Sequence, residues 1–549
     1  MSPAASYVRG DFSRELINVT LGDYFDSVAT THAARQALLV PFQGIDWTYA
    51  QLQARVTSLA AGLLRLGLQP GDRVGIWSQN CAEWVLTQFA TAKAGLVLVN
   101  INPAYRADEL AYSLQKVGCS ALILSPRWKK SDYRALLREA APGPSLRHVI
   151  LIGTEQDDTM IPFDALMVDV TDEDRARLED VANKLCCNDP INIQFTSGTT
   201  GSPKGATLSH RNLLNNGYFV GEAMRLSVID RVCIPVPLYH CFGMVIGNLA
   251  CITHGAAMVF PAEGFDPGAV LRTVEAHRCT ALHGVPTMFI ALLEHPEFER
   301  YDLTSLRTGV MAGAPCPVEV MKRVVERMNM SEVTIAYGMT ETSPISFQSS
   351  LADPAEKRVA SVGLIQPHLE VRIVDTEGNV VPRGTAGELL TRGYSVMLGY
   401  WNDPERTREA VDVDGWMHTG DLATLDADGY CNIVVRLKDM VIRGGENIFP
   451  REIEEFLYRH PKVQDVQVIG VPDDRYGEEV CACVILRPGV NASAAEIKQF
   501  FAGRIAHFKV PRYVRFMDRF PLTVTGKIPK YVLRRQIAQE MGLSERKSA

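Results

Sequence analysis

One stretch of the chain combines glycines, hydroxyl side chains and a lysine in the manner of a loop that binds phosphate. It spans residues 196–205 and reads Thr-Ser-Gly-Thr-Thr-Gly-Ser-Pro-Lys-Gly. Glycine lets backbone amides approach a ligand closely, the hydroxyls add donors, and Lys204 supplies a compact cation. No glycine directly precedes the lysine, so the run is not a Walker A loop. We expect it to lie between a strand at 191–195 and a helix that begins near Ser209.

Three charged residues in other turns carry chemistry that fits the same ligand. Glu341 follows a predicted strand and a Tyr-Gly turn, and its carboxylate suits a hard cation beside a triphosphate. Asp421 lies in a Thr-Gly-Asp turn, where a carboxylate can accept from both hydroxyls of a ribose. Lys527 lies in a predicted exposed loop, from which its ammonium group can reach into a cleft and offset the repulsion between two anionic reactants.

Together these runs resemble the signature sequences of the adenylate-forming superfamily, which includes acyl-CoA synthetases, luciferases and nonribosomal peptide adenylation domains. Besides 196–205, the runs that match in family order are MAGAP at 311–315, AYGMTET at 336–342, TGD at 419–421, RLKD at 436–439, GGEN at 444–447 and PLTVTGKI at 521–528. The match spans almost the whole chain.

The resemblance implies an ATP site and a Mg²⁺ ligand. The residues expected to bind ATP are Thr196, Ser197, Gly198, Thr199, Thr200, Gly201, Ser202, Lys204, Gly313, Ala314, Pro315, Tyr337, Thr340, Asp421, Arg436 and Lys527. Within this set, Thr340 would contact the α-phosphate, Tyr337 would stack on adenine, and Asp421 would bind the ribose. Glu341 would hold Mg²⁺. The expected catalytic residues are Lys527, Glu341, Thr340 and Lys204.

The resemblance also implies a second half-reaction with coenzyme A. Lys438 resembles the hinge about which the C-terminal domain of the family rotates between two arrangements. Lys527 would complete the adenylation site in one arrangement. In the other, a channel for the pantetheine arm would be lined by Gly444, Gly445 and Glu446.

The acid is expected to lie in a pocket beside these residues. The positions that resemble pocket residues of the family are His240, Phe242, His283 and Gly338. A small residue at Gly338 would leave room for an extended chain, and the expected apolar walls are Val310, Met311, Phe242 and Met244. No basic cluster is evident for a second charge on the substrate, which favours a monocarboxylic fatty acid.

The runs at 100–119 and 443–450 look most like the medium-chain branch of the acyl-CoA synthetases. An aryl-CoA ligase of the benzoate type stays an alternative, as does an acyl-AMP ligase that delivers its product to a carrier protein. A nucleotide-binding regulatory protein without turnover is a further alternative, although both Glu341 and Lys527 are present.

Alternating helix and strand signals predict the framework that positions these residues. Apolar spacing behind a Thr-x-x-Gln pattern predicts a helix at 48–66, and short apolar runs predict strands buried on both faces, as at 74–77 and 121–124. The fold class is therefore α/β, with doubly wound α/β subdomains and a β-rich part from about residue 375. We expect an N-terminal domain at 1–436 and a small, mobile α+β C-terminal domain at 437–549.

Composition excludes several other classes of protein. The 549 residues carry 56 Lys and Arg against 63 Asp and Glu, a net charge of −7, so nucleic acid is not expected as a partner. The 12 cysteines form no CxxC pair, and the first 20 residues lack a secretory signal, which favours a cytoplasmic protein. Residues 232–262 contain no charged side chain, but prolines interrupt them, so we expect buried core and no membrane helix. Whether the chain forms a homodimer stays open.

Overall fold

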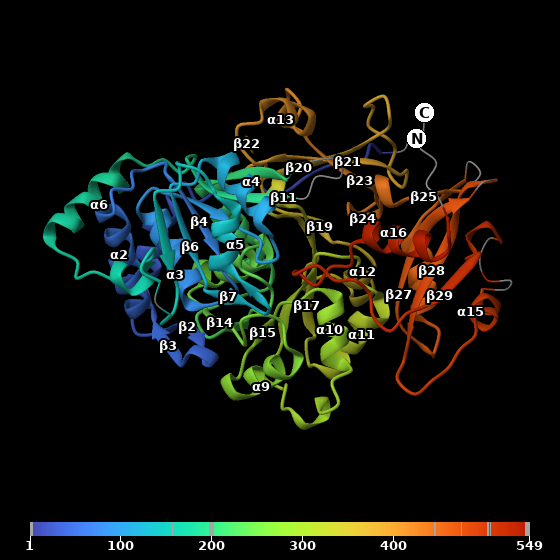
Figure 1. Cartoon of the computed structure of the whole chain (residues 1–549). Helices are drawn as coiled ribbons and strands as arrows, with labels where there is room; N and C mark the ends of the chain where they lie inside the picture. The colour runs from blue at the N-terminus through green and yellow to red at the C-terminus, as the bar shows by residue number, and fades with distance from the viewer. Residues whose placement is uncertain are drawn as a thin grey trace.

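The computed structural model describes residues 4–543 apart from residues 156, 197–202, 444–445, 474, 502–503 and 505–506. Two large sheets, both mainly parallel, lie in the body of the molecule, and the C-terminal elements form a smaller part at one side (Figure 1). This arrangement confirms the α/β class and the doubly wound organisation expected from the sequence.

The first sheet has eight strands, and its antiparallel end carries the predicted phosphate loop. In spatial order the strands are β10 (Ile161–Pro162), β9 (His148–Leu151), β6 (Ala121–Leu124), β4 (Arg73–Trp77), β5 (Val97–Asn100), β11 (Pro190–Thr196), β12 (Lys204–Ser209) and β22 (Gly399–Tyr400). The pairs from β10 to β11 are parallel, and the last two pairs are antiparallel.

The second sheet has nine strands. In spatial order they are β19 (Leu364–Ile365), β18 (Ile345–Gln348), β17 (Glu332–Gly338), β16 (Thr308–Ala312), β15 (Ala281–Leu282), β13 (Arg231–Cys233), β14 (Ala257–Val259), β2 (Gln36–Val40) and β3 (Ile45–Thr48). Parallel pairing runs from β17 through to β2.

Helices cover both faces of each large sheet. The layer between the two sheets holds α1 (Leu21–Thr31), α2 (Tyr49–Arg65), α3 (Ala82–Lys93), α7 (His210–Ala223), the π-helix η3 (Phe242–Leu249) and α8 (Ala250–His254). The outer face of the first sheet is covered by α4 (Ala107–Val117) and α5 (Tyr133–Ala140), and that of the second by α9 (Pro267–His277), α10 (Pro286–Leu293) and α11 (Val318–Arg327). Successive strand residues pack in different layers: Ile76 faces the shared layer and Trp77 faces α4 and α5.

Local sequence signals account for these elements. Helix α2 begins where Thr48 accepts a hydrogen bond from the backbone of Gln51, whose side chain accepts one from the Thr48 backbone, so the predicted capping box is present. The strands predicted at 74–77 and 121–124 are confirmed as β4 and β6.

The surroundings of the predicted phosphate loop differ from the expectation. Ser209 does cap helix α7, but a six-residue strand, β12, precedes the helix. Thr196 at the end of β11 pairs with Lys204 at the start of β12, so the run connects two antiparallel strands. The predicted strand and the helix start at Ser209 are confirmed as β11 and α7, whereas strand β12 between them was not predicted. Residues 197–202 lie outside the described part of the chain.

A five-stranded antiparallel sheet forms the β-rich part. Its strands are β1 (Tyr7–Arg9), β20 (Leu369–Val374), β21 (Gly387–Gly393), β23 (Met417–Leu425) and β24 (Cys431–Arg436). The sheet thus begins six residues before the predicted start near 375, and it recruits β1 from the N-terminal end of the chain, which sequence patterns did not indicate.

The last sheet belongs to the C-terminal part. It contains β26 (Glu446–Ile448), β25 (Val441–Arg443), β28 (Gly477–Leu486), β27 (Val463–Asp473) and β29 (Tyr513–Phe516), with helices α14 (Pro450–Tyr458), α15 (Ala494–Phe500) and α16 (Lys530–Glu540). The α+β composition predicted for this part is confirmed. A turn, η6 (Leu437–Asp439), joins β24 to it.

Smaller elements complete the described chain: the β7 (Arg127–Trp128) and β8 (Ser131–Asp132) pair, α6 (Asp172–Lys184), α12 (Ala355–Ala360) and α13 (Pro404–Ala410). The uncharged stretch at 232–262 is divided among β13, η3, α8 and β14, which are buried. Among the described residues, no helix has the length and apolarity needed to cross a membrane.

Candidate active site

The loop that carries Lys527 is held in one shape by its own hydrogen bonds. The Thr523 N–H donates to the Lys527 carbonyl (2.8 Å), and the Lys527 N–H donates to Thr523 Oγ1 (3.0 Å). Gly526 adopts a φ of 76°, in the left-handed region that favours glycine. Figure 1 shows the segment before α16 reaching back from the C-terminal sheet towards the body of the molecule.

The Lys527 side chain lies against the turn that follows β16. A Cβ added at Gly313 would stand 2.9 Å from Lys527 Cε and 3.6 Å from its Nζ. Among the described residues, no carboxylate pairs with this ammonium group. Burial lowers the Lys527 pKa, and the positive charge of Arg436 adds to that effect. An anion bound beside Gly313 would therefore stabilise the charged form of Lys527.

Glu341 forms a second cluster, with residues from both ends of the phosphate loop. Thr196 Oγ1 (3.1 Å) and the Tyr400 hydroxyl (3.0 Å) both donate to Glu341 Oε1. The Lys204 ammonium lies 4.9 Å from the centre of the Tyr400 ring. Within the described part of the chain, no donor engages Glu341 Oε2. A carboxylate oxygen without a donor among the described residues fits a Mg²⁺ ion that takes its other ligands from phosphate and water.

Asp421 joins two other predicted residues in a third cluster. The Tyr337 hydroxyl donates to Asp421 Oδ2 (2.6 Å), and Arg436 Nε donates to Oδ1 (3.1 Å). Asp421 is buried, and each of its oxygens keeps a lone pair that can accept from another hydroxyl. The exposed turn of Gly313, with its neighbours Ala314 and Pro315, follows the strand adjacent to that of Tyr337.

The predicted entrance to the acid pocket contains His240, Cys241 and Thr340. Cys241 Sγ lies 3.5 Å from His240 Nδ1 and 3.8 Å from Thr340 Oγ1. Burial, with a contribution from the charge of Lys527, lowers the pKa of His240 to about 3, so this imidazole is neutral at pH 7. Burial raises the Cys241 pKa to about 11, which keeps the thiol protonated. A neutral, thiol-lined surface thus faces the Lys527 ammonium.

Two other predicted pocket residues have structural duties that the sequence did not reveal. His283 is fully buried: its Nδ1 accepts from the Val310 N–H (3.2 Å), and its Nε2 lies 3.2 Å from the carbonyl of Ile246. A Cβ added at Gly338 would stand 1.7 Å from the Pro344 carbonyl oxygen. Glycine is therefore required at position 338 because the backbone of Pro344 lies close to it. The missing side chain does not open the space for an acyl chain that the sequence analysis expected.

One expected wall residue points elsewhere. Val310 packs in the layer between the two large sheets, together with Phe242 and Met244. Met311, the next residue on β16, packs on the opposite face with the α10 and α11 core. Because adjacent strand residues face opposite sides, Met311 does not line the same space as Val310, and its assignment to the pocket wall was wrong.

Two groups of predicted residues remain. Ser197 to Ser202, Gly444 and Gly445 lie outside the described residues. Glu446 is exposed on β26, and Lys438 is exposed in the η6 turn.

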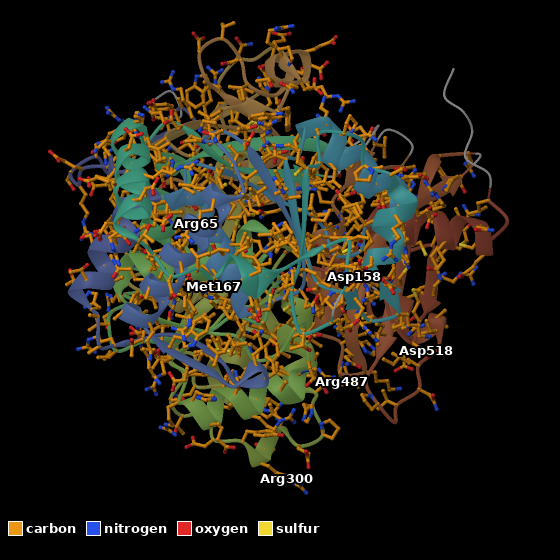
Figure 2. All side chains as sticks on the ribbon, turned by 60° about the vertical axis from the view of Figure 1, so that its left-hand side comes forward. Arg65, Asp158, Met167, Arg300, Arg487 and Asp518 are labelled. Atoms are coloured by element: carbon orange, nitrogen blue, oxygen red, sulfur yellow. The ribbon has the colours of Figure 1, made fainter. Side chains whose placement is uncertain are left out.

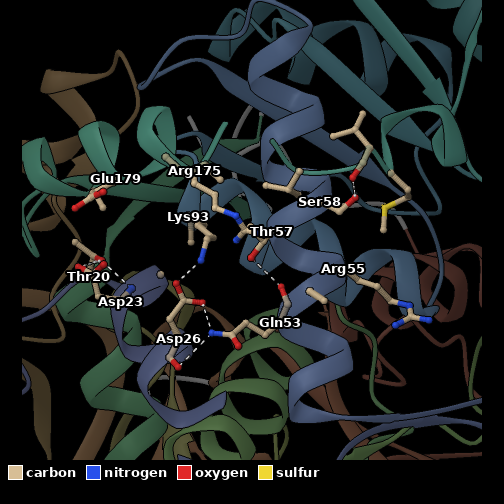
Figure 3. A pocket seen from close by; sticks show the side chains of 18 of the residues that line it. Thr20, Asp23, Asp26, Gln53, Arg55, Thr57, Ser58, Lys93, Arg175 and Glu179 are labelled. Atoms are coloured by element: carbon tan, nitrogen blue, oxygen red, sulfur yellow. Dashed lines mark hydrogen bonds and ion pairs between the residues drawn. The ribbon is translucent and has the colours of Figure 1, made fainter. Parts of the chain in front are cut away.

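A cavity of about 890 Å³ lies between α1, α2, α3 and α6 (Figure 3). Polar side chains such as Asp26, Gln53 and Lys93 line it and bond to one another. None of the predicted site residues is among the described residues that line it, so it is not the predicted acid pocket.

Comparison with known proteins places these clusters in a family. The sequence profile of the AMP-binding enzyme matches residues 25–401, and that of the AMP-binding enzyme C-terminal domain matches residues 452–527. The chain belongs to the AMP-binding enzyme family. Its C-terminal match ends at Lys527, and its N-terminal match contains Lys204 and Glu341.

Relatives of this AMP-binding enzyme include ligases that form acyl-CoA. The chain is 46% identical to the medium-chain acyl-CoA ligase ACSF2, mitochondrial, of Danio rerio, over 98% of this chain and 91% of that one. Its fold matches that of the anthranilate CoA ligase AuaEII in complex with anthranoyl-AMP, with a TM-score of 0.85, 27% identity, and coverage of 96% of this chain and 98% of that one. ATP-bound MatB from Rhodopseudomonas palustris matches with a TM-score of 0.79 and 30% identity, over 96% of this chain and 100% of that one.

Sequence reasoning missed three residues of this enzyme's site: Tyr400, Cys241 and Thr287. Tyr400 is 59 positions from the Glu341 that it contacts, and no motif surrounds it. Cys241 lies between His240 and Phe242, which were both predicted to line the pocket, so its place beside the imidazole could have been found. Thr287 contacts the Lys527 loop from 239 positions away and gave no signal in the sequence.

Proposed function

We propose that the protein is an ATP-dependent fatty acid:CoA ligase that works through an acyl-adenylate. A carboxylate attacks the α-phosphate of ATP and releases pyrophosphate, and the thiolate of CoA then displaces AMP to give acyl-CoA. The observation that carries this proposal is the Lys527 ammonium, which lies beside Gly313 without a carboxylate partner among the described residues.

Lys527 performs the electrostatic part of adenylation. The carboxylate and the α-phosphate are both anionic, so a preorganised cation between them lowers their repulsion and stabilises the charge of the transition state. The position of Lys527 next to His240 and Cys241 supports this role, because the acid is expected to enter there.

The other clusters bind and orient the nucleotide. Asp421, held by Tyr337 and Arg436, accepts from the ribose hydroxyls, and Thr340 and Lys204 contact the phosphates. Glu341, with its free Oε2, would hold a Mg²⁺ ion, which supplies charge neutralisation for the triphosphate when bound.

A medium-chain aliphatic acid fits the site better than an acid with a second charged group. Phe242, Met244 and Val310 are buried in one apolar layer, and His240 is neutral at pH 7. The ACSF2 relative, named as a medium-chain ligase and matched over nearly its whole length, supports the aliphatic assignment. AuaEII is named as an anthranilate ligase at lower identity, so an aryl substrate stays the second candidate.

The remaining expectations also belong to this proposal. The C-terminal domain, residues 437–549, rotates about Lys438 after adenylation, and Gly444, Gly445 and Glu446 then line the CoA channel. A cytoplasmic location is proposed from the sequence, whereas the name of the ACSF2 relative specifies mitochondria.

The test is acid-dependent release of pyrophosphate from Mg-ATP, measured with acetate, hexanoate, octanoate, dodecanoate, palmitate and benzoate, each with and without CoA. We expect the mid-length fatty acids to give the highest kcat/KM and CoA to stimulate turnover. Highest activity with benzoate would support the aryl-CoA ligase, and release without stimulation by CoA would support delivery to a carrier protein. ATP binding without pyrophosphate release on every acid would overturn the proposal in favour of a non-catalytic protein.

A further inference from the structure

The C-terminal part contacts the body of the molecule at the N-termini of two helices. Helix α10 begins after Val285 and helix α11 begins after Pro317, and neither helix has a side-chain cap at that residue. Helix α11 therefore presents amides of its first turn without a side-chain cap, whereas α10 begins with Pro286 and its Met288 N–H donates to the Val285 carbonyl. Both helix ends lie beside residues of the C-terminal part.

At α11 a residue of the C-terminal part supplies the cap. The Val318 N–H, in the first turn of α11, donates to Glu455 Oε2 of helix α14 (3.3 Å). A carboxylate at a helix N-terminus satisfies an unpaired donor and interacts favourably with the helix dipole. Arg451, on the same helix α14, donates to the Ile433 carbonyl of β24 (3.1 Å).

At α10 the contact reaches the catalytic loop itself. Thr287 Oγ1 donates to the Gly526 carbonyl (2.7 Å), one residue before Lys527. A Cβ added at Gly526 would stand 3.0 Å from Val285 Cγ2 and 3.4 Å from Met288 Cε, so the loop is seated closely on the start of α10. Since Thr523 holds the rest of the loop, the Thr287 bond fixes where Lys527 points.

An ion pair adds another contact between the two parts. Arg487 is 3.8 Å from Glu294. Figure 2 shows Arg487 where the C-terminal ribbon lies against the helices at the lower side of the body. This pair is partly exposed, and exposed ion pairs contribute little. The bonds made by Thr287 and Glu455 at the two helix ends are therefore stronger candidates than this ion pair for holding the docked arrangement.

We propose that Thr287 is the positioning residue for Lys527 and that Glu455 holds the C-terminal part in the same arrangement by capping α11. This inference rests on the proposed function for its kinetic consequence. Both residues favour the arrangement that performs adenylation, and both contacts must break before Lys527 can leave Gly313.

The test separates the two half-reactions in the full-length protein. Thr287→Val keeps the branched shape and removes the donor, whereas Thr287→Ser keeps the hydroxyl and serves as the matched control. We expect Thr287→Val to slow single-turnover adenylation of octanoate by about 3- to 10-fold, the effect of one neutral hydrogen bond. Its rate of CoA transfer from supplied octanoyl-AMP should not fall, and Thr287→Ser should stay within about twofold of the wild type.

Hydrogen exchange tests the docking without any reliance on activity. Glu455→Ala should speed amide exchange in the first turn of α11, residues 318–321. Thr287→Val, which removes a hydrogen bond to the Lys527 loop, should speed exchange at the same amides, because both contacts close one interface.

Three results would overturn the inference: an equal loss in both half-reactions for Thr287→Val, unchanged adenylation in that variant, or exchange at 318–321 that responds to Glu455→Ala alone. A wild-type protein that releases no pyrophosphate with any acid would instead overturn the proposed function. The exchange experiment would still decide the docking in that case.

Discussion

Replacement of Lys527 by alanine is the most direct test of the proposed chemistry. The substitution removes one ammonium group from a site where the described residues offer it no carboxylate partner. The loop keeps its shape, because its hydrogen bonds with Thr523 involve the Lys527 backbone. The variant therefore removes charge without removing the scaffold that positions it.

The size of the effect follows from the geometry. Lys527 Nζ stands 3.6 Å from the Cβ position of Gly313, so its reach to a ligand in that turn is a direct contact. Two unit charges about 4 Å apart at an effective dielectric of about 20 interact by about 4 kcal/mol. At about 1.4 kcal/mol per tenfold change, this corresponds to about 10³ in rate, and partial exposure of Lys527 brings the expectation to about 10² to 10³.

The assay compares pyrophosphate release, which reports adenylation, with CoA transfer from supplied acyl-AMP. Adenylation should fall by the stated factor while CoA transfer stays within about twofold, because in the proposed mechanism the C-terminal part has rotated and carried Lys527 away from the site before the second step. Lys130→Ala, at an exposed position in the β7–β8 turn, is the control for loss of a lysine. An equal loss of both half-reactions, or a loss of adenylation below tenfold, would refute the reasoning.

Three further substitutions probe other parts of the chain. Glu341→Gln keeps an acceptor for Thr196 and Tyr400 but loses the charge, so the Mg²⁺ concentration for half-maximal pyrophosphate release should rise by about tenfold or more; an unchanged Mg²⁺ titration would remove the metal role. Burial raises the pKa of Asp465 to about 6, so the folded protein loses stability as pH rises from about 4 to 6. Asp465→Asn should therefore gain up to about 3 kcal/mol in urea unfolding at pH 7 and nothing at pH 4, and equal gains at both would contradict this. Glu479 is fully buried between two arginines, and Glu479→Ala should cost about 3–5 kcal/mol in the same measurement; a cost under about 1 kcal/mol would show that the arginines find other partners.

Local sequence signals predicted those elements that are stabilised by interactions between residues close in sequence. The Thr48 capping box and the apolar strands at 74–77 and 121–124 are set by neighbouring residues and by burial on both faces, and the structure has them at those places. Strand β12 was missed because Gly-Ala-Thr-Leu-Ser lacks a long apolar run. Its hydrogen bonds come from pairing with β11, which no local pattern reports.

The site shows the same division. The motif residues Tyr337, Asp421 and Arg436 were predicted one by one, and the structure brings them into direct contact across two sheets. The role of Gly338 was misjudged because a missing side chain can indicate either space or a close backbone contact, and only the position of Pro344 distinguishes the two. Tyr400 and Thr287 bond to site residues that are distant in sequence, so three-dimensional pairing alone reveals them.

The charge of Lys527 and the contacts at α10 and α11 act on one equilibrium. With no anion present, docking buries the Lys527 ammonium group and lowers its pKa, so desolvation disfavours the docked arrangement. The hydrogen bonds of Thr287 and Glu455 offset this unfavourable free energy. An anionic ligand at Gly313 stabilises that same ammonium group. Docking therefore strengthens the binding of the ligand, and by linkage the bound ligand favours docking by the same factor. Loss of the Thr287 hydroxyl should therefore weaken acyl-AMP binding, which an equilibrium titration of the variant and the wild type would measure. Adenylation releases pyrophosphate and leaves a single phosphate near Lys527, so the negative charge that stabilises the docked ammonium group falls before the CoA thiolate reacts.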